Sequence, residues 1–239
     1  MIRTLVLCSL MGWAGMAQAQ SQCRQALALG LDVSGSVDAR EYRLQIDGVA
    51  VALNDPEVRD KLFAMPSAPV RLMVYEWSGP NDQTVLVPWT EIDSMSTLDV
   101  LIETLRQTRR RDATPGTTLG VAMSQGAYYL SRQNDCWKRT LDISGDGQSN
   151  LGPRPRDVKP TLESKGITIN ALVIGADDPN IGDIRQSEIG ELASYFRAEV
   201  ILGPDAFVMT AIGFNDYARA MRAKLLRELD GLVFSQAIR

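Results

Sequence analysis

The stretch ALALGLDVSGS, residues 26–36, is an apolar run that ends in a carboxylate and a polar loop containing a glycine. A continuous apolar run, without strict alternation, is typical of a strand that is buried on both faces of its sheet. The loop that follows offers one carboxylate and two hydroxyls, on Asp32, Ser34 and Ser36. We therefore predict a strand over 26–33 with oxygen-bearing side chains gathered at its carboxyl end.

Short apolar runs and amphipathic stretches alternate along the rest of the chain. We expect further strands over 70–77, 84–89, 139–144, 167–174 and 199–202. Helices are expected over 38–53, 93–109, 118–131, 157–165, 188–196 and 205–229, the last with a possible interruption at Gly213. Asp38 and Glu41 have the spacing of a capping box at the start of the first helix.

This alternation predicts an α/β fold with a doubly wound, mainly parallel six-stranded sheet and helices on both faces. The turn residues at 78–82 separate two of the expected strands, so those strands are predicted to form a hairpin. That hairpin would add one antiparallel edge strand. In such sheets, functional sites lie outside the carboxyl ends of the strands.

Composition and charge exclude several classes of function. The chain has 239 residues, a size that fits one domain, and a formal net charge of −4. The densest basic run, 109–111, is short and is followed at once by Asp112, which disfavours nucleic-acid binding. There is no histidine, which excludes Ser-His-Asp and Cys-His catalysis and histidine-bound zinc.

The amino terminus is predicted to be a signal peptide over 1–19. Arg3 precedes an apolar stretch at 5–14, and 17–19 forms a small-x-small cleavage signal. An uncleaved anchor is the alternative, although the apolar stretch is short for a bilayer span. The prediction is a periplasmic or secreted protein of one domain, 20–239, with no membrane span after cleavage. Its two cysteines would form either one disulfide or two buried thiols.

Three short pieces of sequence at expected strand or helix boundaries carry the candidate chemistry. They are the D-x-S-x-S loop at 32–36, Gly116-Thr117 before a helix, and Asp146-Gly147 after a strand. Each piece alone is also explained as a turn or a helix cap. Together they offer carboxylate and hydroxyl oxygens, which suit Mg²⁺, or Mn²⁺ or Ca²⁺. The predicted metal ligands are Asp32, Ser34, Ser36, Thr117 and Asp146.

The order of these pieces resembles the metal-ion-dependent adhesion site (MIDAS) of von Willebrand factor A domains, and the resemblance covers about 24–230. The stretch LDISGDG at 141–147, with Asn150, resembles a narrower group of secreted bacterial A-type proteins of unknown function. The stretch GFNDYA at 213–218 resembles the same group. The resemblance implies a domain that binds a partner through a bound cation.

The resemblance also implies a role for each residue. Ser34, Ser36 and Thr117 would bind the cation directly, with Thr118 as the substitute for Thr117. The two carboxylates, Asp32 and Asp146, would act mainly through water. A carboxylate of the partner would complete the coordination. Gly145 departs from the family pattern, in which Ser or Thr often precedes the aspartate, and this departure would shift the Asp146 carboxylate slightly.

In the fold of that family the first and fourth strands are parallel neighbours. Cys23 lies nine residues before Asp32, and Cys136 lies ten before Asp146. The resemblance therefore implies that both cysteines lie at the pole opposite the metal, where a Cys23–Cys136 disulfide can form.

The leading functional hypothesis is a non-enzymatic, metal-dependent protein-binding module, an adhesion or scaffold domain, that captures an acidic group of an unknown protein partner. An alternative is a metal-assisted hydrolase of phosphate or acyl esters, in which the cation activates a water molecule. A third hypothesis is a structural domain whose metal only ties loops together. No nucleic-acid partner is expected under any of the three.

Overall fold

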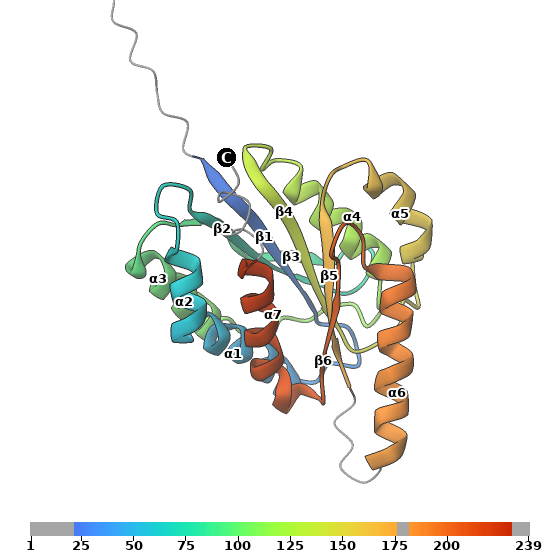
Figure 1. Ribbon diagram of the computed structural model, residues 1–239. Helices are drawn as coiled ribbons and strands as arrows, with labels where there is room; N and C mark the ends of the chain where they lie inside the picture. The colour runs from blue at the N-terminus through green and yellow to red at the C-terminus, as the bar shows by residue number, and fades with distance from the viewer. Residues whose placement is uncertain (1–21, 176–181, 231–239) are drawn as a thin grey trace, which may run out of the picture.

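The computed structural model describes residues 22–175 and 182–230, so the predicted signal peptide at 1–19 lies outside the described residues. The described chain forms a six-stranded sheet in the order β3-β2-β1-β4-β5-β6 (Figure 1). Only β3 runs antiparallel to its neighbour, and the other pairs are parallel. The expected fold class is confirmed. The strands are β1 Cys23–Asp32, β2 Val70–Trp77, β3 Gln83–Ile92, β4 Cys136–Gly145, β5 Thr168–Ile174 and β6 Val208–Ala211.

Helices cover both faces of this sheet (Figure 1). One face packs against α1 Ala39–Asn54, α2 Pro56–Phe63, α3 Met95–Gln107 and α7 Tyr217–Asp230. The opposite face packs against α4 Leu119–Leu130, α5 Pro155–Glu163 and α6 Gly182–Tyr195, which continues into a π-helical turn at Phe196–Val200. The two layers make the sheet the buried centre of the molecule.

Strand β1 supplies side chains to both cores, as its apolar run predicts. Leu27, Leu29 and Leu31 belong to the core that contains α1 and α7. Ala26 and Ala28 belong to the core that contains α4. Successive side chains of a strand point to opposite faces, so a strand buried on both sides needs apolar residues at every position. With β4 beside it, β1 forms the middle of the sheet.

The first helix begins at the predicted capping box. Asp38 Oδ1 accepts a hydrogen bond of 2.8 Å from the Glu41 backbone N–H, and Glu41 Oε2 accepts one of 2.8 Å from the Asp38 N–H. This reciprocal cap satisfies two backbone donors that have no partner within the helix. The cap therefore fixes the point where the D-x-S-x-S loop ends and α1 begins.

The sixth strand lies elsewhere than the sequence analysis predicted. The prediction of a strand over 199–202 is wrong, because most of this segment belongs to the π-helical turn and to an isolated bridge between Leu202 and Ile169. Strand β6 lies instead within the segment 205–229, which was expected to be mostly helical. It pairs with β5 and is aligned by Asn170 Oδ1, which accepts a hydrogen bond of 3.1 Å from the Phe207 N–H.

Two smaller features also differ from expectation. Helix α2 was not predicted, although Pro56 at its start and Asp55 as its cap are ordinary signals of a helix start. The interruption expected at Gly213 is present, since this glycine has a φ of 112° and precedes a short 3₁₀ turn at Phe214–Asp216. Such a φ is rare for a residue with a Cβ atom.

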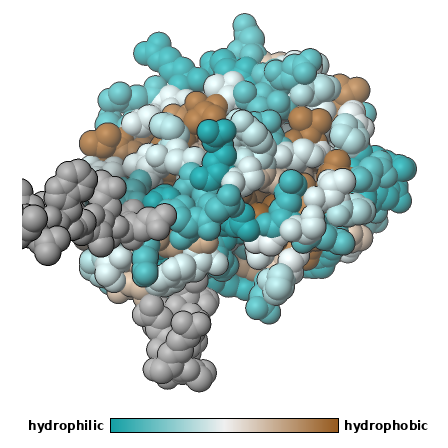
Figure 2. All heavy atoms as spheres, turned by 90° about the horizontal axis from the view of Figure 1, so that it is seen from above, coloured by the Kyte–Doolittle hydropathy of each residue, from teal (hydrophilic) through white to brown (hydrophobic). Residues whose placement is uncertain are grey.

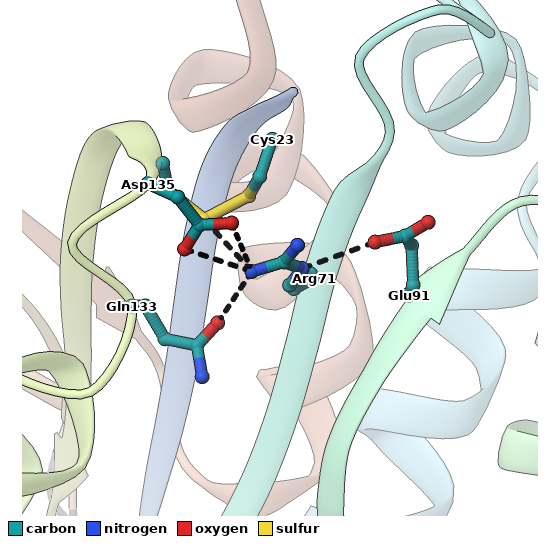
Figure 3. Close-up of a disulfide and its surroundings, with 6 residues drawn as sticks. Cys23, Arg71, Glu91, Gln133 and Asp135 are labelled. Atoms are coloured by element: carbon teal, nitrogen blue, oxygen red, sulfur yellow. Dashed lines mark hydrogen bonds and ion pairs between the residues drawn. A yellow bond between two sulfur atoms is a disulfide. The ribbon is translucent and has the colours of Figure 1, made fainter. Parts of the chain in front are cut away.

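Cys23 and Cys136 form a disulfide between in-register positions of β1 and β4, which confirms the implied pairing. Arg71 lies beside it and joins three segments (Figure 3). Its side chain contacts Glu91 at 3.1 Å, Gln133 at 3.0 Å and Asp135 at 2.8 Å. This pole is mostly hydrophilic, with small scattered hydrophobic groups (Figure 2). None of the helices in the described ranges is long and apolar enough to span a membrane.

Candidate metal centre

The predicted ligands come from loops at the carboxyl ends of the central strands. Asp32 is the last residue of β1, and Asp146 directly follows β4. Because β1 and β4 are parallel neighbours, both loops leave the sheet at the same edge. Thr117 lies just before α4. The fold thus places these segments at the pole opposite the disulfide.

Asp32 is fully buried, and only one of its two carboxylate oxygens has a hydrogen-bond partner. Its Oδ1 accepts a hydrogen bond of 2.8 Å from the Ser34 N–H, whereas its Oδ2 has no hydrogen-bond partner. Gln45, from α1, donates a hydrogen bond of 2.8 Å to the Asp32 carbonyl and fixes this end of β1. A buried carboxylate oxygen without a partner is costly, because it has lost its hydration. The donor set therefore fits a group that would bind this oxygen, such as a cation.

A chain of hydroxyl contacts connects the first loop to the third. Ser34 Oγ and Ser36 Oγ are 3.3 Å apart. Ser36 Oγ in turn donates a hydrogen bond of 2.9 Å to Asp146 Oδ1. Together with the Asp32 contact to the Ser34 backbone, these bonds bring four of the five predicted ligands into one network. The network offers carboxylate and hydroxyl oxygens, the ligand types that Mg²⁺, Mn²⁺ and Ca²⁺ prefer.

The second loop is joined to the first by a close backbone approach. The Gly35 N–H donates a hydrogen bond of 3.0 Å to the Pro115 carbonyl. A Cβ atom on Gly35 would lie 2.8 Å from Pro115 Cβ, so only glycine permits this approach. Asn150 accepts a hydrogen bond of 2.9 Å from the Thr117 N–H, and Thr117 is 5% exposed. These contacts hold Thr117 between the loops that carry Asp32 and Asp146.

Thr118, the substitute considered for Thr117, has a different partner. Its Oγ1 donates a hydrogen bond of 2.5 Å to the Ser78 carbonyl, and its N–H donates to the same oxygen at 3.0 Å. The Thr118 hydroxyl is therefore engaged with the backbone after β2. Thr117 is the better candidate ligand of the two.

Gly145 departs from the family pattern at a crowded position. A Cβ atom there would lie 3.2 Å from the Phe196 ring and 3.4 Å from Asp32 Oδ2. The buried ring of Trp77 is also near, at 3.6 Å. The first of these distances is tighter than an ordinary van der Waals contact, so a larger residue would push against the ring. Because residue 145 is a glycine, no side chain at this position packs against Asp32 Oδ2.

Burial dominates the electrostatics of the two carboxyls. Burial and, to a smaller extent, the charge of Asp146 raise the pKa of Asp32 to about 8, against the hydrogen bonds from Ser34 that lower it. Burial also raises the pKa of Asp146. Two carboxylates so placed repel each other, and a divalent cation would offset both charges. Within the described ranges, no three or more Asp, Glu, His or Cys side chains gather into a metal-binding group.

Sequence reasoning missed the residues that support the ligands. Gln45 donates one hydrogen bond to the Asp32 carbonyl, and the Ser78 carbonyl accepts two from Thr118, the neighbour of the predicted ligand Thr117. Gln45 is a buried polar residue on the apolar face of α1, and this is the one signal that could have identified it. Asn150 belonged to the resemblance, and the structure gives it a contact with Thr117.

An arginine-rich groove is lined by residues that follow the first ligand loop and precede the second in the chain. It has a volume of about 690 Å³ and begins at Ala39, in the first turn of α1. A second hollow of about 460 Å³ shares Ala39 and Arg110 with it and reaches Ala113, two residues before Pro115. We call the combined hollow the arginine groove. Its cationic lining residues are Arg43, Arg106, Arg109, Arg110 and Arg111.

Solved structures with a similar fold include a matrix protein and a pilus adhesin, both at low identity. The proximal thread matrix protein 1 of the mussel byssus, in a structure with a zinc-occupied MIDAS motif, is 14% identical with a TM-score of 0.58; the match covers 87% of this chain and 46% of that one. The pilus adhesin SpaC of Lactobacillus rhamnosus GG is 14% identical with a TM-score of 0.60, covering 90% and 31%.

A von Willebrand factor type A structure from Catenulispora acidiphila is 14% identical with a TM-score of 0.57, covering 87% of this chain and 43% of that one. The chain thus spans less than half the length of each of these proteins. They establish that the fold is of the von Willebrand factor A type. No curated protein matches the sequence. A family model described as "Protein of unknown function (DUF1194)" matches residues 22–233, and the chain belongs to that family.

Proposed function

We propose that this protein is a non-enzymatic, metal-dependent binding module that captures an acidic group of a partner protein. Asp32, Ser34, Ser36, Thr117 and Asp146 would hold the cation. The observation that carries the proposal is that Asp32 Oδ2 is fully buried and has no hydrogen-bond partner. Through its other oxygen, Asp32 is joined to the Ser34–Ser36–Asp146 network. A bound cation would satisfy this oxygen.

Neutral hydroxyls as direct ligands would leave much of the charge of the cation uncompensated. A carboxylate from a partner is the natural complement, since it supplies both a hard oxygen and a negative charge. Mg²⁺ is the first candidate, with Mn²⁺ and Ca²⁺ next, because the donors are oxygens. Zn²⁺ is a further candidate, because it occupies the MIDAS motif of the mussel protein.

The arginine groove supports an acidic partner independently of the metal. Arg109 and Arg110 line it, and Arg110 precedes Pro115 of the second ligand loop by five residues in the chain. Guanidinium groups bind carboxylates in a two-pronged geometry, and a positive rim speeds the approach of a negative partner. We therefore propose that the partner offers several acidic side chains, one of which reaches the cation.

The proposed location is the periplasm or the exterior of the cell. The Cys23–Cys136 disulfide supports it, because disulfides persist mainly in oxidising compartments. Pilus and byssus proteins with the same fold also function outside the cell.

Binding of the purified protein to beads coated with polyglutamate tests this proposal. We expect binding in Mg²⁺ that EDTA abolishes, and no binding to polylysine beads. Reversal of charge in the groove, Arg109→Glu with Arg110→Glu, should weaken binding about tenfold or more. Arg132→Glu, near the disulfide pole, should not. Equal binding in Mg²⁺ and in EDTA would overturn the metal-dependent capture. Metal-dependent turnover of phosphate or acyl esters, lost in Asp32→Asn, would replace it with a hydrolase.

A further inference from the structure

A second group of charged side chains lies inside the molecule, between β4, β5 and α7. Lys224 of α7 is fully buried, and so are Asp142 of β4 and Glu228 of α7 to within 1% exposure. Lys224 Nζ is 2.7 Å from Asp142 Oδ2 and 2.7 Å from Glu228 Oε1. One amine nitrogen therefore contacts two carboxyl groups without access to water. None of these residues belongs to the candidate metal centre.

Neighbouring residues hold Glu228 in place. Asn170 of β5 donates a hydrogen bond of 2.7 Å to Glu228 Oε1, the oxygen that also contacts Lys224. Lys138 Nζ donates to the Glu228 backbone carbonyl at 3.2 Å. The Phe207 ring lies 5.2 Å from Lys224 Nζ and closes the apolar side of the group. Asn170, a side chain of the sheet, thus holds Glu228 next to the Lys224 amine.

Lys224 and Asp142 form a buried ion pair, in which Asp142 Oδ2 lies 2.7 Å from Lys224 Nζ. The other oxygen, Asp142 Oδ1, has no hydrogen-bond partner. Burial raises the pKa of Asp142 to about 7, against the opposing effect of Lys224. Burial therefore favours the neutral carboxylic acid over the buried carboxylate. An uncharged acid next to an amine is the arrangement that amide formation requires.

We propose that Lys224 and Asp142 condense into an isopeptide bond, with Glu228 as the group that transfers the proton. Proton exchange within the pair gives a neutral amine and a neutral acid. Lys224 Nζ attacks Asp142 Cγ, so an N–C bond forms. Glu228 takes the proton from the nitrogen and delivers it to the departing hydroxyl, the C–O bond breaks, and one water molecule leaves. Glu228 returns to its starting state, and no oxidant or other reactant is needed.

The cross-link explains why this costly group is retained in the interior. Condensation removes the charges of Lys224 and Asp142, and with them the cost of burying these two charges. Glu228 keeps the hydrogen bond that Asn170 donates to its Oε1. It also joins helix α7 to the middle of the sheet, where β4 is already tied to β1 by the disulfide. Strand β4 would then carry two covalent links, one to each of two distant segments.

Intact-mass measurement of the purified protein, denatured and reduced, tests the proposal. The expected mass is about 18 Da below that of the sequence, which is the mass of one water molecule. Peptide mapping fixes the amino terminus for this comparison. Trypsin should release a branched peptide that joins 140–156 to 223–227, because an amidated Lys224 is not cleaved.

Two variants make the measurement specific. Glu228→Gln keeps the shape of the side chain but lacks the proton-accepting carboxylate, and should retain its full sequence mass. Lys159→Met removes an ammonium on α5, on the opposite face of the sheet, and should still lose about 18 Da. Wild-type protein at its full sequence mass, with normal cleavage after Lys224, would overturn the proposal. That result is decisive even where Glu228→Gln fails to fold.

Discussion

Ser36 Oγ donates a hydrogen bond of 2.9 Å to Asp146 Oδ1, and the two residues are 110 positions apart in the chain. The bond joins the loop after β1 to the loop after β4. It forms between strands that are parallel neighbours, so the fold itself brings the two loops together. The proposed cation would therefore meet ligands that are already in position, and little ordering would oppose its binding.

Metal-free stability should depend on pH through Asp32. Its pKa is about 8 in the folded chain, against 3.8 for an ordinary aspartate. Between these values the folded state holds a proton that the unfolded state has lost. Stability should therefore fall as the pH rises from about 4 to about 8, by at most about 1.4 kcal/mol per pH unit. Urea denaturation in EDTA at several pH values measures this slope.

The stabilisation of the folded protein by a bound cation should increase with pH, opposite to the fall in metal-free stability. Binding needs the ionised carboxylate, so a cation must displace the proton of Asp32. The rise in Tm that Mg²⁺ causes should grow from pH 6 to pH 8 and then level off. Asp32→Asn should have a smaller slope in EDTA, with a part from Asp146 remaining, and should lack the cation response. A wild-type response that is the same at pH 6 and pH 8 would contradict the assigned role of Asp32.

Gly35→Ala should weaken cation binding by separating two ligand loops. The added Cβ would lie 2.8 Å from Pro115 Cβ, so the loops must move apart. A cost of about 1–3 kcal/mol in stability is expected from such overpacking. Gly147→Ala is the matched control, because a Cβ there meets no atom within 4 Å. Calorimetric titration with Mg²⁺ should show the loss of affinity in the first variant only; equal affinities would contradict the loop arrangement.

The variants Thr117→Val and Thr118→Val should show which of the two hydroxyls binds the cation and which one only stabilises the fold. Loss of the Thr117 hydroxyl should remove most of the cation response and change metal-free stability little. Loss of the Thr118 hydroxyl breaks its bond to the Ser78 carbonyl and should cost about 1 kcal/mol. The cation response should survive in this second variant. Thermal melts with and without Mg²⁺ distinguish the two, and a reversed result would assign the ligand to Thr118.

Removal of the disulfide should destabilise the fold and leave the metal centre intact. The bond closes a loop with a sequence separation of 113 residues. The chain-entropy argument gives a loss of about 4–5 kcal/mol in Cys23→Ser/Cys136→Ser. Urea denaturation measures the loss. Because the disulfide lies at the opposite pole, the same Mg²⁺ affinity is expected in the variant, and a large decrease would show that the two poles are coupled.

Local signals made most of the fold predictable. The apolar run of β1 identified a buried central strand, and the spacing of Asp38 and Glu41 identified the start of α1. Strand β6 could not be predicted, since the apolar segments at 199–202 and 208–211 are similar in kind. Pairing with β5 and the bond from Asn170 decide between them, and both are contacts across the fold.

The candidate site was predictable only in part. The residues Asp32, Ser34 and Ser36 share one loop, so their spacing was informative. The choice between Thr117 and Thr118 depends on the Ser78 carbonyl, and the position of Thr117 depends on Asn150, both distant in sequence. The contact of Lys224 with Asp142 was equally hidden, because it joins α7 to a strand far back in the chain.

The most direct test of the metal centre is a thermal melt of wild-type protein and Asp32→Asn at pH 8 in EDTA, Mg²⁺, Mn²⁺, Ca²⁺ and Zn²⁺. Asparagine matches the shape of aspartate and removes a buried charge, so the variant should be at least as stable as wild type in EDTA. At least one cation should raise the Tm of wild type, by mass action on the folded state, and should leave that of Asp32→Asn unchanged. Equal shifts in both proteins, or no shift with any cation, would contradict a metal centre at Asp32.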